Sequence, residues 1–339
     1  MYTLETNNII FSICLSCGGT MASCLSLIPL YRGYLRRRFK LSGLSFQNVQ
    51  IDPETEIYFW GPPPGLLTGK PSVVLLQGFG PDSTWQWQNQ VPFLAPHFDL
   101  YIPHLLFLGE SKTTSQDRRD VFQAACVVKL LEKIRVEKYS VVGHSYGSFV
   151  AYHMARLWPE RVEKVTIASC ALNFLLNQDY LDLLELTGTE TICDLVLPST
   201  PQKLKLLMAI TMKKQLSRIP NFIIKDAFYV SFVSPPLILF HKRIYVKYAY
   251  YGNEFSKCWY ISQDIFANDI EERRELLNCI TLGQEESSRV SPLLQEVLIL
   301  WGQNDELFRL EKAFQLKEYD IGKRGSLGSN KERGAHDSS

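Results

Sequence analysis

The sequence lacks a charge imbalance. Its 339 residues include 36 Lys and Arg against 35 Asp and Glu, a formal net charge of +1. This balance excludes a protein that binds nucleic acid mainly through charge, and one with an acidic tail. Hydrophobic residues make up 46% and charged residues 21%, as in globular proteins and unlike disordered chains. The length allows one large α/β domain or two smaller ones.

Cysteine is also scarce. The chain has 8 Cys, and only Cys14 and Cys17 have the CxxC spacing, with no second pair after them. This pattern excludes a disulfide scaffold and argues against a zinc site. We therefore expect no metal site, and we expect free, mostly buried thiols, as in a reducing compartment. The serine chemistry inferred below needs no organic cofactor either.

Charged residues are absent from residues 9–30, a largely apolar stretch just long enough to span a bilayer. Basic residues follow this stretch, unlike in a secretory signal peptide, and their position favours a cytoplasmic body. A spanning helix is the less favoured interpretation. The other starts the protein at Met21 and leaves a short amphipathic arm, suited to a membrane surface or to packing on the main domain. We assign residues 1–44 to this arm and expect a cytoplasmic protein, with peripheral or N-terminal membrane association left open.

Strands and helices alternate after the arm. Alternating polarity predicts a hairpin over residues 46–60, and apolar runs predict strands at 72–76, 98–102, 139–142, 162–168 and 296–301. Helical periodicity is found at 119–134, 148–158 and 310–319. This order is typical of a mostly parallel sheet with helices on both faces. Residues 172–292 break the rhythm, so we interpret them as a helical lid between two core parts, 45–171 and 293–320.

The motif Gly143-x-Ser145-x-Gly147 lies between a predicted strand and a predicted helix. This arrangement is a nucleophile elbow, in which a sharp turn lifts a serine hydroxyl clear of the backbone. Glycines are needed because the turn crowds the residues two before and two after the nucleophile. We therefore predict Ser145 as a nucleophile. The alternative is a glycine-rich turn with an idle serine.

An oxyanion hole needs two backbone N–H groups that point to one place. The amide of Tyr146, directly after the nucleophile, is one candidate. The loop after the strand at 72–76 supplies the other, and there the Phe79 amide is the candidate. Gly78 and Gly80 flank Phe79 and allow the backbone to approach a substrate closely.

An acid is expected later in the chain, at the end of another strand. Asp305 follows the strand at 296–301 and so falls at the carboxyl edge of the sheet, where ligands and catalytic groups collect. Its task would be to orient an imidazole and to stabilise the charged form of that ring. The alternative is a turn aspartate that accepts backbone hydrogen bonds.

These motifs resemble the α/β-hydrolase superfamily, in particular plant hydrolases similar to monoacylglycerol lipases and epoxide hydrolases. The motifs are QGFG at 77–80, PHLLFLGES at 103–111, VVGHSYGS at 141–148, WPERVEKVTIAS at 158–169 and LWGQNDELF at 300–308. The resemblance implies Ser145 as nucleophile, Asp305 as acid, and the Phe79 and Tyr146 amides as oxyanion hole. An epoxide hydrolase would need Asp at the elbow, so Ser145 favours ester or thioester chemistry.

Three positions depart from the family pattern. Gln77 stands where His is usual, and we expect it to support the loop by hydrogen bonding. His104 replaces an Asp, with loss of a structural contact rather than of chemistry. Ser148 stands where Gly is common, and it is small enough for the helix to pack on the strand.

The C-terminus departs further. The family has a last strand followed by the catalytic His, whereas residues 321–339 are polar and contain no apolar run. We therefore expect the last strand to be missing and this tail to be disordered. His336 is the only histidine after Asp305, so it is the candidate base. Shifting permitted codons for residues 326–336 by one base can encode Val-Trp-Glu-Val-Ile-Lys-Asn-Ala-Gly-His. A frameshift or mis-splice is thus a hypothesis that the transcript would test.

The favoured function is a serine hydrolase of carboxylic esters that acts through Ser145, Asp305 and a histidine. The lid would form a pocket for an apolar acyl or alkyl group, although most of its apolar residues would simply form its own core. These residues include Phe222, Phe228, Phe232, Leu237, Ile238, Leu239 and Phe240. The alternative, favoured by the altered C-terminus, is a degenerate hydrolase-fold protein that binds a small apolar ligand without turnover. A defective gene product is a third possibility.

Overall fold

The computed structural model describes residues 27–66, 68–80, 82–170, 172, 178–211, 270–280, 290–303, 305, 307–318, 321 and 326–330. Its strands are β1 (Ser45–Asp52), β2 (Thr55–Gly61), β3 (Ser72–Leu76), β4 (Asp99–Pro103), β5 (Lys112–Thr113), β6 (Tyr139–His144), β7 (Val162–Ala168), β8 (Glu296–Gly302) and β9 (Ser326–Asn330). Its helices are α2 (Leu27–Leu41), α3 (Ser83–Trp87), α4 (Val91–Leu94), α5 (Asp120–Lys133), α6 (Tyr146–Leu157), α7 (Gln178–Thr187), α8 (Ile192–Val196), α9 (Pro201–Thr211), α13 (Ile270–Asn278) and α14 (Glu311–Glu318).

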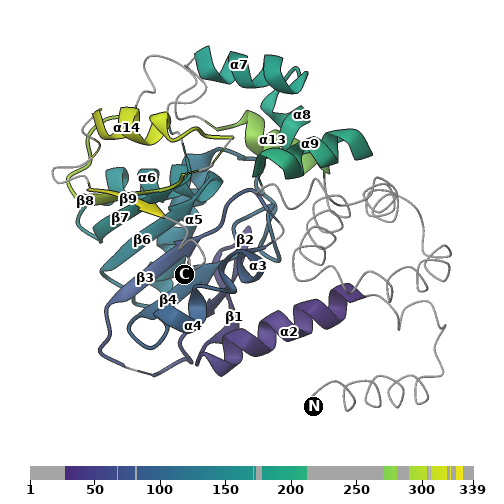
Figure 1. The fold of residues 1–339 in the computed structure, drawn as a ribbon. Coiled ribbons are helices and arrows are strands. Elements are labelled where there is room, and N and C mark those ends of the chain that lie inside the picture. Colours follow the sequence, from purple (N-terminus) through teal and green to yellow (C-terminus); the bar gives the residue numbers. More distant parts are fainter. Residues whose placement is uncertain are drawn as a thin grey trace, which may run out of the picture.

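One sheet organises this part of the chain (Figure 1). Its order is β1-β2-β4-β3-β6-β7-β8-β9, and β5 pairs with β2. The pairs β1–β2 and β2–β4 are antiparallel, whereas every neighbour from β4 to β9 is parallel. The predicted mostly parallel sheet, its hairpin and its strand–helix alternation are confirmed.

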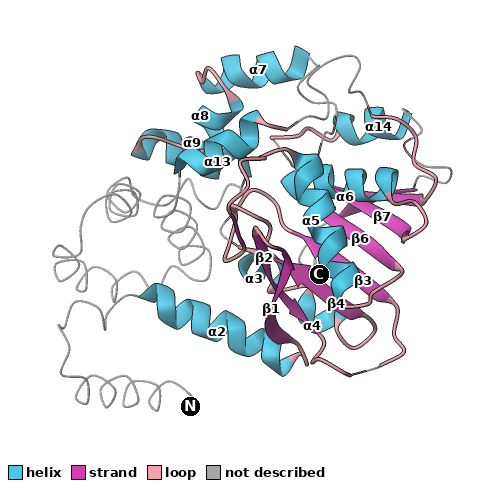
Figure 2. Ribbon diagram, turned by 180° about the vertical axis from the view of Figure 1, so that it is seen from behind, coloured by secondary structure: helices cyan, strands magenta, loops and turns pink. Residues whose placement is uncertain are grey.

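Both faces of the sheet are covered, because its central strands are apolar on both sides. On β3, Val74 and Leu76 join a core cluster with α5 and α6. Val73 and Leu75 point the other way, into a cluster with Trp87 of α3 and parts of α2 and α4. Figure 2 shows α5 in front of the strands, on the first of these faces. A continuous apolar run is what such a doubly covered parallel strand requires.

The prediction that the last strand is missing is wrong. Residues Ser326–Asn330 form β9, which pairs in parallel with β8 from Leu298↔Ser326 to Gly302↔Asn330. The prediction failed because it demanded an apolar run. In the described order β9 ends the sheet, and strand pairing is made by backbone groups that every non-proline residue carries. The predicted polar tail 321–339 therefore contains a strand, and residues 331–339 lie outside the described part.

The N-terminal arm is described from residue 27 onward, as α2. Leu35 and Phe39 on this helix are buried, and the Phe39 and Trp60 rings lie 5.1 Å apart between centroids. Arg36 forms an ion pair with Glu110. This section of the arm therefore packs on the main domain. Among the described helices, none is long and apolar enough to cross a membrane.

The helices α7, α8, α9 and α13 come from the predicted lid and gather beyond one end of the sheet (Figure 1). The Arg273 side chain of α13 reaches Gly80, which follows the carboxyl end of β3. At least α13 therefore lies at the end of the sheet where the chain leaves β3. Residues 212–269, which include the apolar residues considered for a substrate pocket or for the core of the lid, lie outside the described part.

Candidate active site

Ser145 occupies a sharp turn between β6 and α6. Its backbone angles are φ 50° and ψ −121°, and its N–H donates to the Ala168 carbonyl at 2.9 Å. A positive φ in a residue with a side chain costs on the order of 1–3 kcal/mol and persists only where the surroundings impose it. The hydrogen bond to the end of β7 is one such restraint. The turn predicted around Ser145 is therefore present.

The two motif glycines are required by contacts between backbones. A Cβ at Gly143 would lie 2.4 Å from the Gly147 carbonyl oxygen, and one at Gly147 would lie 2.5 Å from the Leu76 carbonyl oxygen. Backbone atoms cannot move aside cheaply, so neither position has room for alanine. Ser148 fits as predicted, because its buried hydroxyl donates to the Gly143 carbonyl at 2.9 Å.

The loop after β3 lies against the nucleophile turn. A Cβ at Gly78 would be 3.1 Å from the Ser145 Cβ, so glycine allows this close approach. Gln77 supports the loop as expected: its side-chain Nε2 donates to the Leu108 carbonyl at 2.7 Å. The loop is thus in place to supply an oxyanion donor, and the assignment of the Phe79 and Tyr146 amides as donors stays a prediction.

Asp305 lies just beyond β8, as predicted. Its Oδ1 accepts the Leu307 N–H at 3.0 Å and the Phe308 N–H at 2.8 Å. Burial raises the pKa of this carboxyl, while the two backbone hydrogen bonds and one from Ser169 lower it. Ser169 follows β7, so the carboxyl lies near the exits of β7 and β8. Both interpretations of Asp305 are therefore compatible with its contacts: a turn aspartate and a group available to an imidazole.

The strand order brings three chain exits to one edge. The strands β6, β7, β8 and β9 are adjacent and parallel, so the chain leaves all of them at the same side. Ser145 follows β6, and Asp305 follows β8. His336 comes six positions after Asn330, the last residue of β9, and lies outside the described residues. The nucleophile–acid–base order of the sequence prediction is thus compatible with this topology.

Four histidines fall within the described part: His97, His104, His144 and His153. His153 Nε2 lies 3.2 Å from Asp120 Oδ2, so this ring is held within the interface of α5 and α6. His97 is exposed. Burial lowers the pKa of His144 to about 4, which keeps the ring neutral at physiological pH. A Cβ at Gly78 would lie 2.9 Å from His144 Nδ1, so His144 lies beside the loop.

His104 shows what replaced the usual aspartate. The ring is buried, and its Nδ1 accepts the Glu110 N–H at 3.4 Å while Nε2 lies 3.4 Å from the Thr84 hydroxyl. Burial lowers its pKa. A Cβ at Gly109 would be 2.9 Å from the ring. His104 thus makes contacts of its own at this position, while the expected loss of the contact made by an aspartate stays a prediction.

Comparison with known proteins agrees with this geometry. A family model described as alpha/beta hydrolase fold matches residues 71–188, from β3 to the end of α7. The nucleophile turn and the loop after β3 both fall within that range. The chain has the α/β-hydrolase fold.

Individual α/β-hydrolases match parts of the chain. A soluble epoxide hydrolase of Corynebacterium sp. is 35% identical over 97 residues, which are 28% of this chain and 33% of that protein. The chain thus spans about a third of the length of this relative. A solved membrane phospholipase A, a bacterial virulence factor, has a TM-score of 0.62 at 18% identity, covering 96% of this chain and 88% of that one. A 2-hydroxy-6-oxo-6-phenylhexa-2,4-dienoate hydrolase from Rhodococcus has a TM-score of 0.51 at 16% identity, covering 84% and 90%. These structural likenesses show the fold.

Sequence reasoning missed several buried polar residues of this chain. Gln123 of α5 donates to the Leu106 carbonyl and accepts the Leu106 N–H, at 2.8 and 3.0 Å. Asp120 is fully buried beside His153. Arg273 of α13 is 3% exposed. A polar residue at an otherwise apolar helical position could have indicated Gln123, but no sequence motif indicates Arg273.

Proposed function

We propose that this chain is a serine hydrolase that cleaves carboxylic esters with an apolar acyl or alkyl group. The observation that carries the proposal is Ser145 in its constrained positive-φ turn, with the Gly78 loop packed against it. The related epoxide hydrolases give the competing reaction class. Serine favours acyl transfer, because opening an epoxide by this fold calls for a carboxylate at the elbow.

In the proposed reaction, Ser145 Oγ attacks the acyl carbon while His336 accepts the hydroxyl proton. The carbonyl oxygen becomes an oxyanion, held by the Phe79 and Tyr146 amides. The alcohol leaves with the proton from His336, and an acyl-serine remains. Water then attacks the acyl-enzyme and gives a proton to His336, which passes it to Ser145 Oγ as the bond to the acyl group breaks and the acid leaves. Asp305 would stabilise the charged imidazole in both halves. These steps need no metal and no organic cofactor.

The apolar substrate class is supported by the composition of the lid and by the fold likeness to a solved membrane phospholipase A. Association of the N-terminal arm with an anionic membrane surface belongs to the same proposal. Its support is the outer side of α2, where Arg37 and Lys40 are exposed and Leu41 is 77% exposed. Sedimentation with anionic vesicles, with and without residues 1–26, tests this part alone.

Hydrolysis of p-nitrophenyl esters of increasing acyl length, beside an epoxide such as styrene oxide, tests the proposed reaction. We expect turnover of the esters, preference for longer acyl chains, no epoxide opening, and loss of turnover in Ser145→Ala. Ser140→Ala on the same strand is the matched control and should keep its activity. Epoxide opening would overturn the reaction class. Saturable binding of the esters without turnover would favour the ligand-binding alternative.

A further inference from the structure

A lid arginine contacts the loop that carries the proposed oxyanion donor. Arg273 of α13 donates from its guanidinium to the Gly80 carbonyl at 3.0 Å. The same guanidinium lies 5.9 Å from the centroid of the Phe79 ring. Arg273 is only 3% exposed, although 193 positions separate it from Gly80. A buried, charged side chain from the lid therefore contacts both Phe79 and Gly80.

This loop needs restraint because glycines flank Phe79. Glycine loses more conformational freedom on ordering than any other residue, so a Gly-Phe-Gly segment is costly to hold in one shape. The Gln77 side chain fixes the beginning of the loop through Leu108. Arg273 acts at the other end, and a charge-assisted hydrogen bond is about twice as strong as a neutral one. The two contacts thus hold Gln77 and Gly80, the residues at the two ends of the segment that contains the Phe79 amide.

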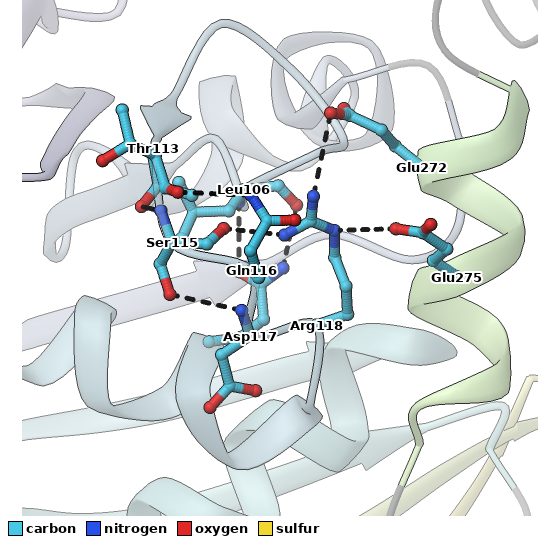
Figure 3. A network of polar contacts seen from close by, with 10 residues as sticks. Leu106, Thr113, Ser115, Gln116, Asp117, Arg118, Glu272 and Glu275 are labelled. Atoms are coloured by element: carbon cyan, nitrogen blue, oxygen red, sulfur yellow. Dashed lines mark hydrogen bonds and ion pairs between the residues drawn. The ribbon is translucent and has the colours of Figure 1, made fainter.

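The helix that carries Arg273 is itself fastened to the core. Arg118, just before α5, lies 3.3 Å from Glu275 and 3.9 Å from Glu272 (Figure 3). The Arg118 guanidinium also donates to the Ser115 carbonyl at 2.8 Å, and it lies 3.9 Å from the Phe107 ring centroid. Arg118 is 8% exposed, whereas the Glu275 and Glu272 side chains are 60% and 44% exposed, so each ion pair joins a buried guanidinium to a carboxylate that faces water. They set the position of α13 above the loop.

The helix α13 also contacts the rest of the described lid. Arg274 lies 3.9 Å from Asp194 of α8, and the Cys193 thiol lies 3.2 Å from the Asn278 side-chain oxygen. One helix therefore connects α8, the core residue Arg118 and the loop after β3. A displacement of α13 would pull Arg273 away from Gly80.

We propose that Arg273 is a positioning residue that holds the Phe79 amide in its oxyanion-binding orientation. The ability of the loop to bind the oxyanion then depends on the contacts that hold α13 on the core. The catalytic part of this inference rests on the proposed esterase function. The structural part, restraint of the loop by Arg273, does not.

Hydrogen exchange of the peptide that contains residues 77–80 tests the restraint without any turnover. Arg273→Met removes the hydrogen bond, and we expect exchange of this peptide to become at least about 10-fold faster. Arg274→Met is the matched control on the same helix: it loses the contact with Asp194 and should leave the loop unchanged. Equal loop exchange in Arg273→Met and wild type would overturn the proposal.

Arg118→Gln is a second variant, for use if Arg273→Met does not fold. It loosens α13 without touching the loop. We expect exchange to rise in α13 and in residues 77–80 together. A rise in α13 alone would show that the loop does not depend on the helix, and would overturn the proposal.

Ester kinetics test the catalytic part. In Arg273→Met we expect kcat to fall about 10- to 100-fold with KM changed less than about twofold, and Arg273→Lys to restore part of kcat. A fall confined to KM would contradict a role for Arg273 in transition-state positioning. If the wild type hydrolyses no ester, the proposed function fails, while the exchange experiment still decides whether Arg273 restrains the loop.

Discussion

The Gly147 α-carbon lies so close to the Leu76 carbonyl that a Cβ on it would be 2.5 Å from the carbonyl oxygen. This contact joins α6 to the end of β3 and fixes the turn that presents Ser145. Alanine at Gly147 would have to displace backbone in the middle of the sheet. We expect Gly147→Ala to lower the free energy of unfolding by about 3 kcal/mol or more, as measured by urea denaturation.

Gly33 provides the matched control for that substitution. It lies in α2, where a Cβ would have nothing within 4 Å, and its φ is not positive. Gly33→Ala should leave stability unchanged or raise it by up to about 1 kcal/mol, because alanine favours helix. Equal stability of Gly147→Ala and wild type would contradict the close packing of the elbow on β3.

Replacing Asp305 by Asn should lower turnover strongly and change stability little. Burial raises the pKa of this carboxyl, so the folded protein disfavours its ionised form. A raised pKa stabilises the fold only at acidic pH, and this contribution is lost as pH rises through the folded-state value. At pH 7 Asp305→Asn should therefore cost little or no stability, because the amide oxygen can still accept the Leu307 and Phe308 N–H groups. Turnover should fall by about 10³- to 10⁴-fold, since the imidazole loses its charged partner.

Asp52→Asn is the control for that substitution. Asp52 pairs with Lys129 at 2.8 Å, far from the proposed site in the sheet order, on β1. It should change stability by less than about 1 kcal/mol and leave turnover unchanged. Equal turnover in Asp305→Asn and wild type would leave Asp305 with only a role in the turn after β8.

The half-buried His144 should make the protein less stable in mild acid. Its pKa falls from 6.5 to about 4 on folding because burial disfavours the charged ring. Between these values the unfolded chain binds a proton that the folded chain does not, so stability decreases as pH falls from about 6.5 to about 4. His144 should contribute about 3 kcal/mol to this loss. Urea denaturation at pH 7.5 and 4.5 should show a smaller loss of stability in His144→Gln than in wild type. An unchanged pH dependence in His144→Gln would refute the burial argument.

Two truncations separate the strand β9 from the proposed base. A chain ending at Asn330 keeps β9 and loses His336, so we expect near wild-type stability without turnover. A chain ending at Gly325 also loses the five residues paired with β8, and should be less stable by roughly 2–4 kcal/mol, at about 1 kcal/mol per lost hydrogen bond. Thermal unfolding and ester turnover of both chains check this. Equal stability of the two would show that β9 contributes nothing to the sheet.

The parts of this fold that could be predicted are those in which a local structure requires particular residue types. The doubly buried strand β3 needs a continuous apolar run, and a serine in a left-handed turn needs small neighbours, so both were evident in the sequence. The strand β9 was missed because its pairing is carried by backbone groups, which composition does not reveal. The helices α3 and α4 were missed because each is short, with five and four residues.

The contacts made by Arg273 and His104 could not be predicted for a different reason. Both depend on residues brought together from distant parts of the chain. Arg273 reaches Gly80 across 193 positions, and Thr84, which lies beside His104, is 20 positions away. A pattern of neighbouring residues in the sequence does not indicate contacts between residues so far apart. Local motifs therefore indicated the candidate nucleophile, acid and loop, and the structure added what supports them.

A serine nucleophile at the elbow, activated by a base that follows β9, should be detectable by covalent labelling. The intact mass and the modified peptide would be measured after exposure to a fluorophosphonate, in wild type, Ser145→Ala, His336→Ala and His97→Ala. We predict a single adduct on Ser145, absent from Ser145→Ala, slowed at least about 10³-fold in His336→Ala, and unchanged in His97→Ala. An adduct on another residue, or labelling of His336→Ala at the wild-type rate, would contradict the proposed Ser145–His336 pair.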